Sequence, residues 1–387
     1  MLGYFLVAAS LAIALATGAG PRQIAGYFLE GLLDWSTIQL LGVVTLIEML
    51  TVFLQGNGSL DRMLVALRRV LDDPRGLIGL VPSVLGLFPV PGGAVLSAPM
   101  VEKYGDELGI DPDRKASINL FFRHIWDQVF PFKPHLILAA AVLNVPLFTL
   151  IGWHLPVTLL GAAAGFVYLV GWGSRPQDGE QSEAIEPGQG APLWLEVAPL
   201  VIPLLLALLL RIDFLYAMAV GLLFGVVTQG VRGGLLGKMI RKGVQPKLLF
   251  ILASVMVFKT VVDHSGLVQT LATLFTSLGV PIPLLVVALP LAMGVLTGLE
   301  TAVVAMAFPL LVGMIPDGTP QLPCMLLMMV SNSVGSTLSP AHICMAAGNQ
   351  YYGARLGRVL ALSAPPQVVR LAFTALVAWG MLTYLPR

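Results

Sequence analysis

The stretch SNSVGSTLSPAHICMAAGNQ, residues 331–350, places a dense polar cluster inside a chain that is otherwise strongly apolar. A lipid-facing helix offers no partners to hydroxyl and amide groups, and leaving them unsatisfied in hydrocarbon is costly. The stretch also contains Gly335 and Pro340, which interrupt helices. It therefore predicts the unwound middle of a broken helix, whose hydroxyls and Asn332 surround a bound solute or ion. The alternative is that small hydroxyl residues pack helices together, which explains one or two of them but not the whole cluster.

The composition identifies the class of protein. Of 387 residues, 57% are hydrophobic and 11% are charged, whereas soluble domains carry roughly 25% charged residues. Apolar runs near the length of a membrane-spanning helix recur, and they do not alternate as the strands of a membrane barrel do. We therefore expect an all-α polytopic membrane protein. The net charge of +1 provides no field that attracts nucleic acid.

Nine membrane spans and two re-entrant hairpins account for the apolar segments. The hairpins are 76–100 and 281–312, because proline and glycine divide them into arms too short to cross a bilayer. The alternatives are a single span at 76–100 and two tilted spans at 281–312. The expected spans are 1–19, 36–55, 118–150, 152–172, 192–211, 213–230, 246–263, 320–348 and 356–384. Residues 1–19 lack a basic start, which favours a retained span over a signal peptide.

Lysine and arginine in short loops predict the orientation. The loops 57–75, 102–117, 231–247 and 349–358 contain most of these residues and all fall on one side in this topology. We assign that side to the cytoplasm of a multi-pass protein in the cell (inner or plasma) membrane. The N-terminus is then cytoplasmic and the C-terminus outside, and the polar linker 173–191 is cytoplasmic.

The two halves of the chain resemble each other. VFPFKPHLILAAAVLN (129–144) is similar to VGSTLSPAHICMAAGN (334–349), and a proline-bounded hairpin precedes each. We expect two inverted-topology repeats, 1–172 and 213–387, joined by the linker and a connecting helix at 192–211. Each contains a hairpin and a broken helix, 118–150 in the first and 320–348 in the second. Inverted repeats with broken helices are a recurring plan of secondary transporters.

Charged residues at membrane depth are the strongest candidates for function. Arg123 and Asp127 are spaced to share a helix face; Arg123 suits a carboxylate or phosphate, and Asp127 with His124 suits proton transfer. The alternative is an ion pair at the membrane edge. Lys133 lies in the first break and is suited to neutralise an anion. His135 and His342 follow the two break prolines, either as ligands or as hydrogen-bonded structural residues.

The hairpin tips complete the candidate site. Glu300 is suited to coordinate Na⁺ or to exchange a proton, and its alternative role is to cap the returning helix. A Na⁺ ion is expected near Glu300 and Asn332. The full set of candidate binding residues is Pro91, Gly92, Gly93, Arg123, His124, Asp127, Lys133, His135, Gly298, Glu300, Thr301, Ser331, Asn332, Ser333, Ser336, Thr337, Ser339 and His342. No motif for a cofactor, a catalytic metal or an enzyme nucleophile is present, and Cys324 and Cys344 are read as small core residues.

Three motifs carry a family resemblance: FPVPGGAVLSAPMV (88–101), FFRHIWDQVFPFKPHLILA (121–139) and GVLTGLETAVVAMAFPLL (294–311). They resemble an uncharacterised integral membrane family, domain of unknown function 401, within the ion transporter superfamily. The wider architecture is similar to dicarboxylate/sodium symporters and to gluconate and C4-dicarboxylate carriers. The resemblance implies an elevator-type, dimeric secondary transporter. The tips here lack the Ser-Asn-Thr motif of the sodium-coupled carriers, which leaves dicarboxylate and sodium open.

The expected function is therefore secondary active transport of a small anionic organic solute, coupled to H⁺ or Na⁺, by an elevator mechanism in a homodimer. Two alternatives remain: a cation/proton antiporter that uses Glu300 and Asp127, and a lipid-handling membrane protein. An enzyme is not expected. A lipid flippase needs a groove open to the bilayer, whereas a solute carrier needs a polar site enclosed by protein.

Overall fold

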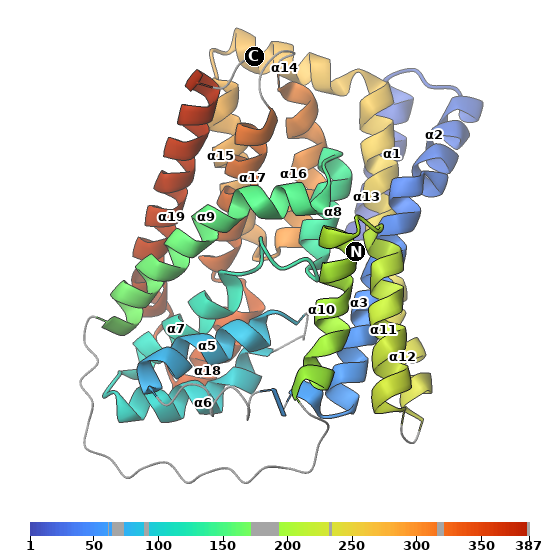
Figure 1. Cartoon of the computed structure of the whole chain (residues 1–387). Helices are drawn as coiled ribbons and strands as arrows, with labels where there is room; N and C mark the ends of the chain where they lie inside the picture. Colours follow the sequence, from blue (N-terminus) through green and yellow to red (C-terminus); the bar gives the residue numbers. More distant parts are fainter. Residues whose placement is uncertain are drawn as a thin grey trace.

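The computed structural model describes residues 1–60, 62–63, 73–88, 93–171, 193–231, 234–315 and 321–384. Within these residues the protein is built of helices, as expected for an all-α membrane protein (Figure 1). The first half contains α1 (Leu2–Ala16), α2 (Pro21–Leu33), α3 (Trp35–Gly56), α5 (Pro74–Gly86), α6 (Gly93–Glu107), α7 (Pro112–His124), α8 (Pro134–Leu143), α9 (Leu147–Gly165) and the π-helical η1 (Phe166–Gly171). The second half contains α10 (Leu193–Leu209), α11 (Phe214–Gln229), α12 (Leu235–Gly243), α13 (Pro246–Ser265), α14 (Leu267–Ser277), α15 (Ile282–Thr297), α16 (Glu300–Met314), α17 (Gln321–Thr337), α18 (Ile343–Tyr352) and α19 (Leu356–Tyr384).

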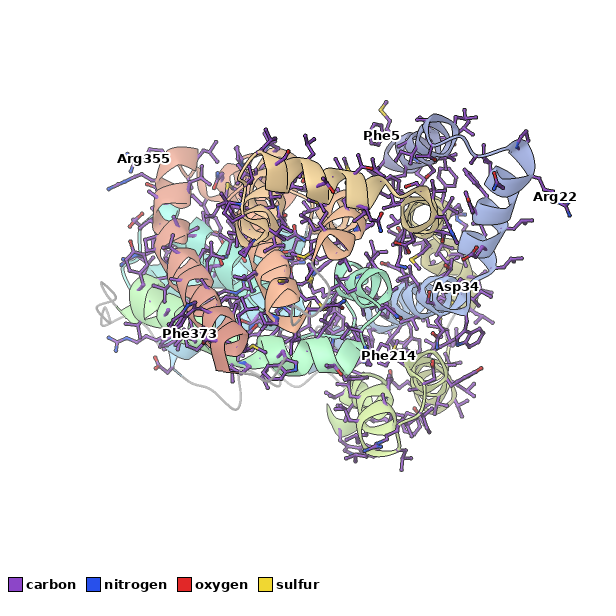
Figure 2. All side chains as sticks on the ribbon, turned by 90° about the horizontal axis from the view of Figure 1, so that it is seen from above. Phe5, Arg22, Asp34, Phe214, Arg355 and Phe373 are labelled. Atoms are coloured by element: carbon purple, nitrogen blue, oxygen red, sulfur yellow. The ribbon has the colours of Figure 1, made fainter. Side chains whose placement is uncertain are left out.

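The helices form two groups. One group contains α1–α3 and α10–α13, in which α13 packs on α1 and α2, and α3 packs on α11 and α12. The other contains α5–α7, α9, α15 and α17–α19, and its closest packing is between α15 and α17. Figure 2 shows Arg355 and Phe373 on the side of the second group and Phe5, Asp34 and Phe214 on the other side. The pair α8 and α16 joins the groups, because α16 contacts α13 and α8 contacts α3.

The same order of elements occurs in both halves: a helical hairpin followed by an interrupted helix. The hairpins are α5–α6 and α15–α16, close to the predicted ranges, and they lie at opposite ends of the molecule in Figure 1. The interrupted helices are α7–α8 and α17–α18. The first of these ends at Leu143, because Asn144 adopts a left-handed conformation, so the predicted range 118–150 extended too far. The predicted linker 173–191 lies outside the described residues.

Four helical stretches in the described residues are long and apolar enough to cross a membrane: Trp35–Gly56, Leu147–Gly171, Leu235–Ser265 and Leu356–Thr383. Together with the shorter apolar helices, they make this a multi-pass membrane protein. The sequence did not predict α2, α12 or α14. On α12 only Leu235, Met239 and Gly243 are buried, while its lysine and arginine side chains are exposed, so this helix is amphipathic.

Two of the four loops predicted to share one side of the membrane, 102–117 and 349–358, meet in the structure. The Arg355 guanidinium donates to Asp113 at 2.6 Å, which joins the end of α18 to the start of α7. The Arg62 Nε donates to Glu196 at 2.7 Å, which joins the segment after α3 to the start of α10. The hydrogen bonds from Arg355 hold the pKa of the Asp113 carboxyl below its ordinary value. The orientation of the chain in the membrane stays a prediction.

Close packing of α15 on α17 requires glycine at two positions. A Cβ atom on Gly335 would lie 2.3 Å from the Leu291 carbonyl oxygen, and one on Gly294 would lie 2.7 Å from the Ser336 nitrogen. Both contacts are to backbone, which cannot rotate away, so even one added methyl group must separate the helices.

We therefore expect Gly335→Ala to lower the stability of the folded protein by about 1–3 kcal/mol, the usual cost of overpacking. Thermal unfolding of the purified protein in detergent measures this. Gly348→Ala is the matched control, since nothing lies within 4 Å of a Cβ atom at that helical glycine. Equal melting temperatures for the two variants would contradict the packing argument.

Candidate functional site

The candidate site lies where the two helix interruptions meet the tip of the second hairpin. The first interruption is the irregular segment 125–133 between α7 and α8, and the second is 338–342 between α17 and α18. The tip is Gly298, in the left-handed region with φ of 64°. A Cβ atom there would lie 2.7 Å from the His342 nitrogen, so glycine permits this approach. Tip and second interruption are therefore in direct backbone contact.

Asp127 is the centre of the first interruption. Its carboxylate lies 2.7 Å from His124 Nδ1 and 2.6 Å from Lys133 Nζ. Lys133 also donates to the Gly86 carbonyl at 2.5 Å, which connects the site to the end of α5. Because α7 ends at His124, the predicted helical spacing of Arg123 and Asp127 is wrong. Both are buried within the protein.

Glu300 joins the second hairpin to the first interruption. Its carboxylate lies 2.8 Å from His135 Nε2, and its carbonyl accepts a hydrogen bond from Asn332 Nδ2 at 3.2 Å. The predicted alternative of Glu300 as the helix cap is wrong, because Leu299 occupies that position and Glu300 begins α16. Thr301 follows it on α16 and is half-buried. Residues from both halves of the chain thus meet at one carboxylate.

The SNS stretch is helical, which corrects its prediction as unwound backbone. α17 continues to Thr337, and the interruption begins only at Leu338. The polar groups are instead buried between helices: Ser331, Asn332, Ser333, Ser336 and Thr337 are all at most 1% exposed. Ser336 Oγ donates to Asn332 Oδ1 at 3.2 Å. Ser339 Oγ donates to the Val295 carbonyl at 2.6 Å and tethers the interruption to α15.

The first hairpin approaches the same site. A Cβ atom at Gly93 would lie 1.9 Å from Nη2 of Arg123, so the guanidinium occupies the space a side chain there would fill. On the other arm of the hairpin, a Cβ atom at Gly86 would lie 2.2 Å from the Arg123 carbonyl oxygen. The predicted residues Pro91 and Gly92 lie outside the described residues. The described ends of this hairpin thus contact both Arg123 and Lys133.

Four residues of this region were not predicted as site residues: Gln128, Cys344, Gln367 and Arg370. Arg370 of α19 is fully buried and donates to Gln128 Oε1 at 2.8 Å, and more weakly to Ser333 Oγ and Gln367 Oε1 at 3.3 and 3.4 Å. Cys344 lies beside His124 and His342 instead of in the apolar core. The sequence could have identified Arg370, because a charged residue inside an apolar span is itself an indication of function.

The buried charges are unequal. Arg123, Lys133 and Arg370 are cationic, whereas Asp127 and Glu300 are the acidic residues of the cluster. Lys133 pairs with Asp127, and His135 pairs with Glu300. The hydrogen-bond partners of Arg370 among the described residues are all neutral. The cluster therefore has an excess of positive charge even when every histidine is neutral.

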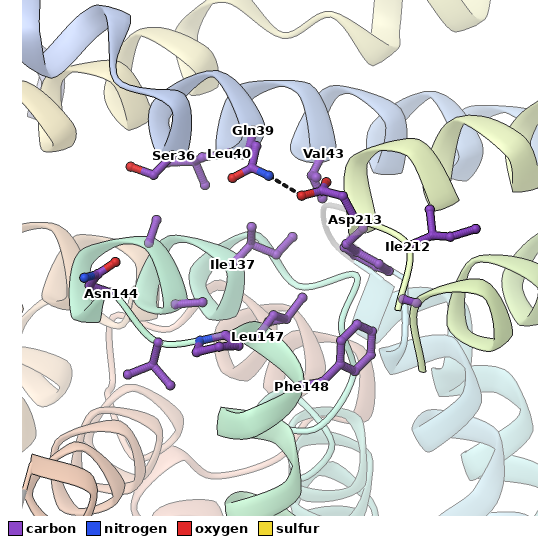
Figure 3. A pocket seen from close by; sticks show the side chains of 16 residues that line it. Ser36, Gln39, Leu40, Val43, Ile137, Asn144, Leu147, Phe148, Ile212 and Asp213 are labelled. Carbon is purple, nitrogen blue, oxygen red and sulfur yellow. Dashed lines mark hydrogen bonds between the residues drawn. The ribbon is translucent and has the colours of Figure 1, made fainter. Parts of the chain in front are cut away.

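A separate pocket opens between α3, α8 and the α10–α11 turn (Figure 3). It has a volume of about 450 Å³ and is lined mainly by apolar side chains. Gln39 donates to Asp213 across its edge. The pocket shares no lining residue with the charged cluster. It lies between the two helix groups, with α8 from the interrupted helix on one side and α3 on the other.

Comparison with known proteins places the chain in a family. Residues 5–381 match the family described as "Protein of unknown function (DUF401)". The chain belongs to this family. No sequence among the curated proteins matches it. The structure is similar to the YdaH transporter of Alcanivorax borkumensis, whose crystal structure is described as having an unusual topology, with a TM-score of 0.72 and 14% identity over 99% of this chain and 97% of that one.

At 14% identity, this similarity concerns the fold alone. The DUF401 chain thus has the helical architecture of a transporter over its whole length.

Proposed function

We propose that this DUF401 protein is a secondary active transporter for a small anionic organic solute. The observation that carries the proposal is Arg370: a fully buried guanidinium whose described hydrogen-bond partners are neutral. A buried charge without an opposite partner is strongly disfavoured. A carboxylate or phosphate of the solute is suited to supply that partner, because the guanidinium fork binds such groups through two parallel hydrogen bonds.

The surroundings of Arg370 support a solute site. Ser333 and Gln128, which hold the guanidinium, are chain neighbours of Asn332 and Asp127. Asn332 contacts Glu300, and Asp127 contacts Lys133. An anion at Arg370 therefore lies within one network that includes the first helix interruption, α17 and the second hairpin. The fold shared with a transporter agrees with this role, and the ion transporter superfamily and its dicarboxylate and gluconate carriers are the proposed relatives.

Coupling to H⁺ or Na⁺ is assigned to Glu300. Its carboxylate is at the hairpin tip, held by His135 alone among the described side chains, and a carboxylate is a suitable oxygen ligand for a hard cation such as Na⁺. The antiporter alternative requires two exchanging carboxylates. It fits less well, because Asp127 is already neutralised by Lys133 at 2.6 Å. The cytoplasmic N-terminus, the outer C-terminus, the inverted relation of the repeats and the homodimer are parts of the same proposal.

Transport by purified protein in vesicles tests the proposal. We expect an inward H⁺ or Na⁺ gradient to drive accumulation of a labelled small carboxylate, gluconate and a C4-dicarboxylate being the first probes. Excess unlabelled anion should compete, whereas a neutral amide of the same carbon skeleton should not. Equal competition by the neutral amide would contradict an anion site, and scrambling of labelled lipid without solute uptake would favour a lipid-handling protein.

The proposed motion is an elevator-like shift of the hairpins and interrupted helices against a scaffold of α1–α3 and α10–α14, in which α14 packs on α13. Gly313 of α16 and Val268 of α14 are suited to test it, because a Cβ atom at Gly313 lies 3.3 Å from the Val268 Cβ. This is close to the separation in a disulfide. We expect oxidation of the Gly313→Cys/Val268→Cys protein to stop transport and reduction to restore it. Wild-type protein under the same oxidant is the control, and unchanged transport by fully cross-linked protein would show that this contact does not move.

A further inference from the structure

Three further side chains, apart from the anion site, lie together at the meeting point of the two helix interruptions. They are His124 at the end of α7, His342 in the second interruption, and Cys344 in the first turn of α18. One ligand atom from each lies within 4.8 Å of the others. His124 belongs to the first half of the chain and the other two to the second half, 218 residues away. The arrangement is therefore a product of the tertiary fold.

The hydrogen bonds determine where the protons on the imidazoles lie. His124 Nδ1 is 2.7 Å from the Asp127 carboxylate, and His342 Nδ1 is 2.8 Å from the Gly298 carbonyl oxygen. Carboxylates and carbonyls only accept hydrogen bonds at these atoms. Both Nδ1 atoms must therefore carry a proton and donate it. When both imidazoles are neutral, neither Nε2 atom has a proton, and each presents a lone pair.

Those two Nε2 atoms face each other at 3.0 Å. Two lone pairs at that distance repel, so the geometry calls for a cation between or beside them. A metal with bonds of 2.0–2.1 Å to both nitrogens in tetrahedral geometry separates them by about 3.3 Å, a change of a few tenths of an ångström. The rings stand nearly perpendicular, at 79° with centroids 4.6 Å apart, so both nitrogens can point at one position.

We propose that His124, His342 and Cys344 form a binding site for a thiophilic divalent cation of the zinc class. Two imidazoles and one thiolate are typical ligands for such ions and leave a fourth position for water or another donor. The contacts to Asp127 and Gly298 are the outer hydrogen bonds that orient metal-bound histidines in proteins. Lys133 in turn holds Asp127. A bound ion joins the first interruption, the second interruption and, through Gly298, the hairpin tip.

Metal binding by the whole protein tests this site without reference to transport. Purified protein is first treated with a chelator, and Zn²⁺ alone is then the probe in equilibrium dialysis. We expect one Zn²⁺ per chain. Co²⁺ serves as the spectroscopic probe, because a thiolate ligand adds a charge-transfer band to its spectrum. Wild-type protein that takes up neither ion at its own concentration would overturn the proposal, and the two imidazoles would then share a proton.

Variants identify the ligands. We expect Cys344→Ser to remove the thiolate band and to weaken Zn²⁺ binding at least tenfold, and His342→Gln to do the same. Cys324→Ser is the matched control, because Cys324 is buried in α17 among apolar side chains. An unaltered Co²⁺ spectrum in Cys344→Ser, or loss of the band in Cys324→Ser, would place the metal elsewhere and overturn the assignment. If a ligand variant fails to fold, the wild-type thiolate band and its rate of loss on alkylation of Cys344 decide the question.

Discussion

Replacing Arg370 with methionine is expected to reduce anion transport about a hundredfold. Methionine keeps much of the length and apolar surface of the side chain, but it removes the buried guanidinium that faces neutral partners. A charge-assisted hydrogen-bonded contact contributes about 1.5–3 kcal/mol, and about 2.8 kcal/mol corresponds to a hundredfold change. Uptake of labelled anion into vesicles, with the protein amount determined in each preparation, measures the effect.

Arg370→Lys separates charge from geometry. Lysine retains the positive charge but lacks the planar fork, so we expect weaker apparent affinity with a smaller loss of maximal rate. Arg358→Met is the matched control, since Arg358 lies on the same helix and its side chain is 65% exposed. Monodisperse elution and an unchanged melting temperature exclude misfolding. Parental transport by a well-folded Arg370→Met protein would show that Arg370 only supports the packing of α19 on α17.

Glu300→Gln is expected to abolish ion-driven accumulation while passive exchange of the solute continues. Glutamine preserves the shape and the hydrogen bond to His135, but it can neither exchange a proton nor neutralise Na⁺. A tenfold gradient of a singly coupled ion supports about tenfold accumulation, so the internal concentration should fall from that ratio to the external value. Gradient-driven uptake and solute counterflow, measured in the same vesicles, distinguish lost coupling from lost binding.

The control for this variant is Glu102→Gln, which makes the same chemical change at an exposed residue hydrogen-bonded to Tyr351. Accumulation by Glu300→Gln at the parental rate would show that Glu300 serves packing, and Asp127 would be the remaining carboxylate to examine. Loss of both accumulation and counterflow would show instead that Glu300 takes part in binding the solute. The first outcome would contradict the role of Glu300 in ion coupling, whereas the second would show that Glu300 belongs to the solute-binding site.

Much of the architecture was determined by the sequence alone. Apolar runs near twenty residues require helices, because the backbone must satisfy its own hydrogen bonds in lipid. The proline- and glycine-rich segments 76–100 and 281–312 predicted two re-entrant hairpins; the structure has the helix pairs α5–α6 and α15–α16 at these places, and their re-entry into the membrane stays a prediction. An interruption was predicted at 130–134, and the irregular segment is longer, from the end of α7 at His124 to the start of α8 at Pro134. The amphipathic α12 was missed, because its apolar residues are too few to resemble a span.

The site depended on the tertiary structure. The sequence identified His124, Asp127, Lys133, Glu300 and His342 as unusual at membrane depth. It did not indicate that Asp127 pairs with Lys133 or that Glu300 pairs with His135, because these partners are set by irregular backbone and by contacts between the two halves. Arg370 and Cys344 each acquire a neighbour more than 200 residues away in the sequence, Gln128 for Arg370 and His124 for Cys344. Local hydropathy determines which segments enter the membrane, whereas the packing of the two halves decides which polar groups meet there.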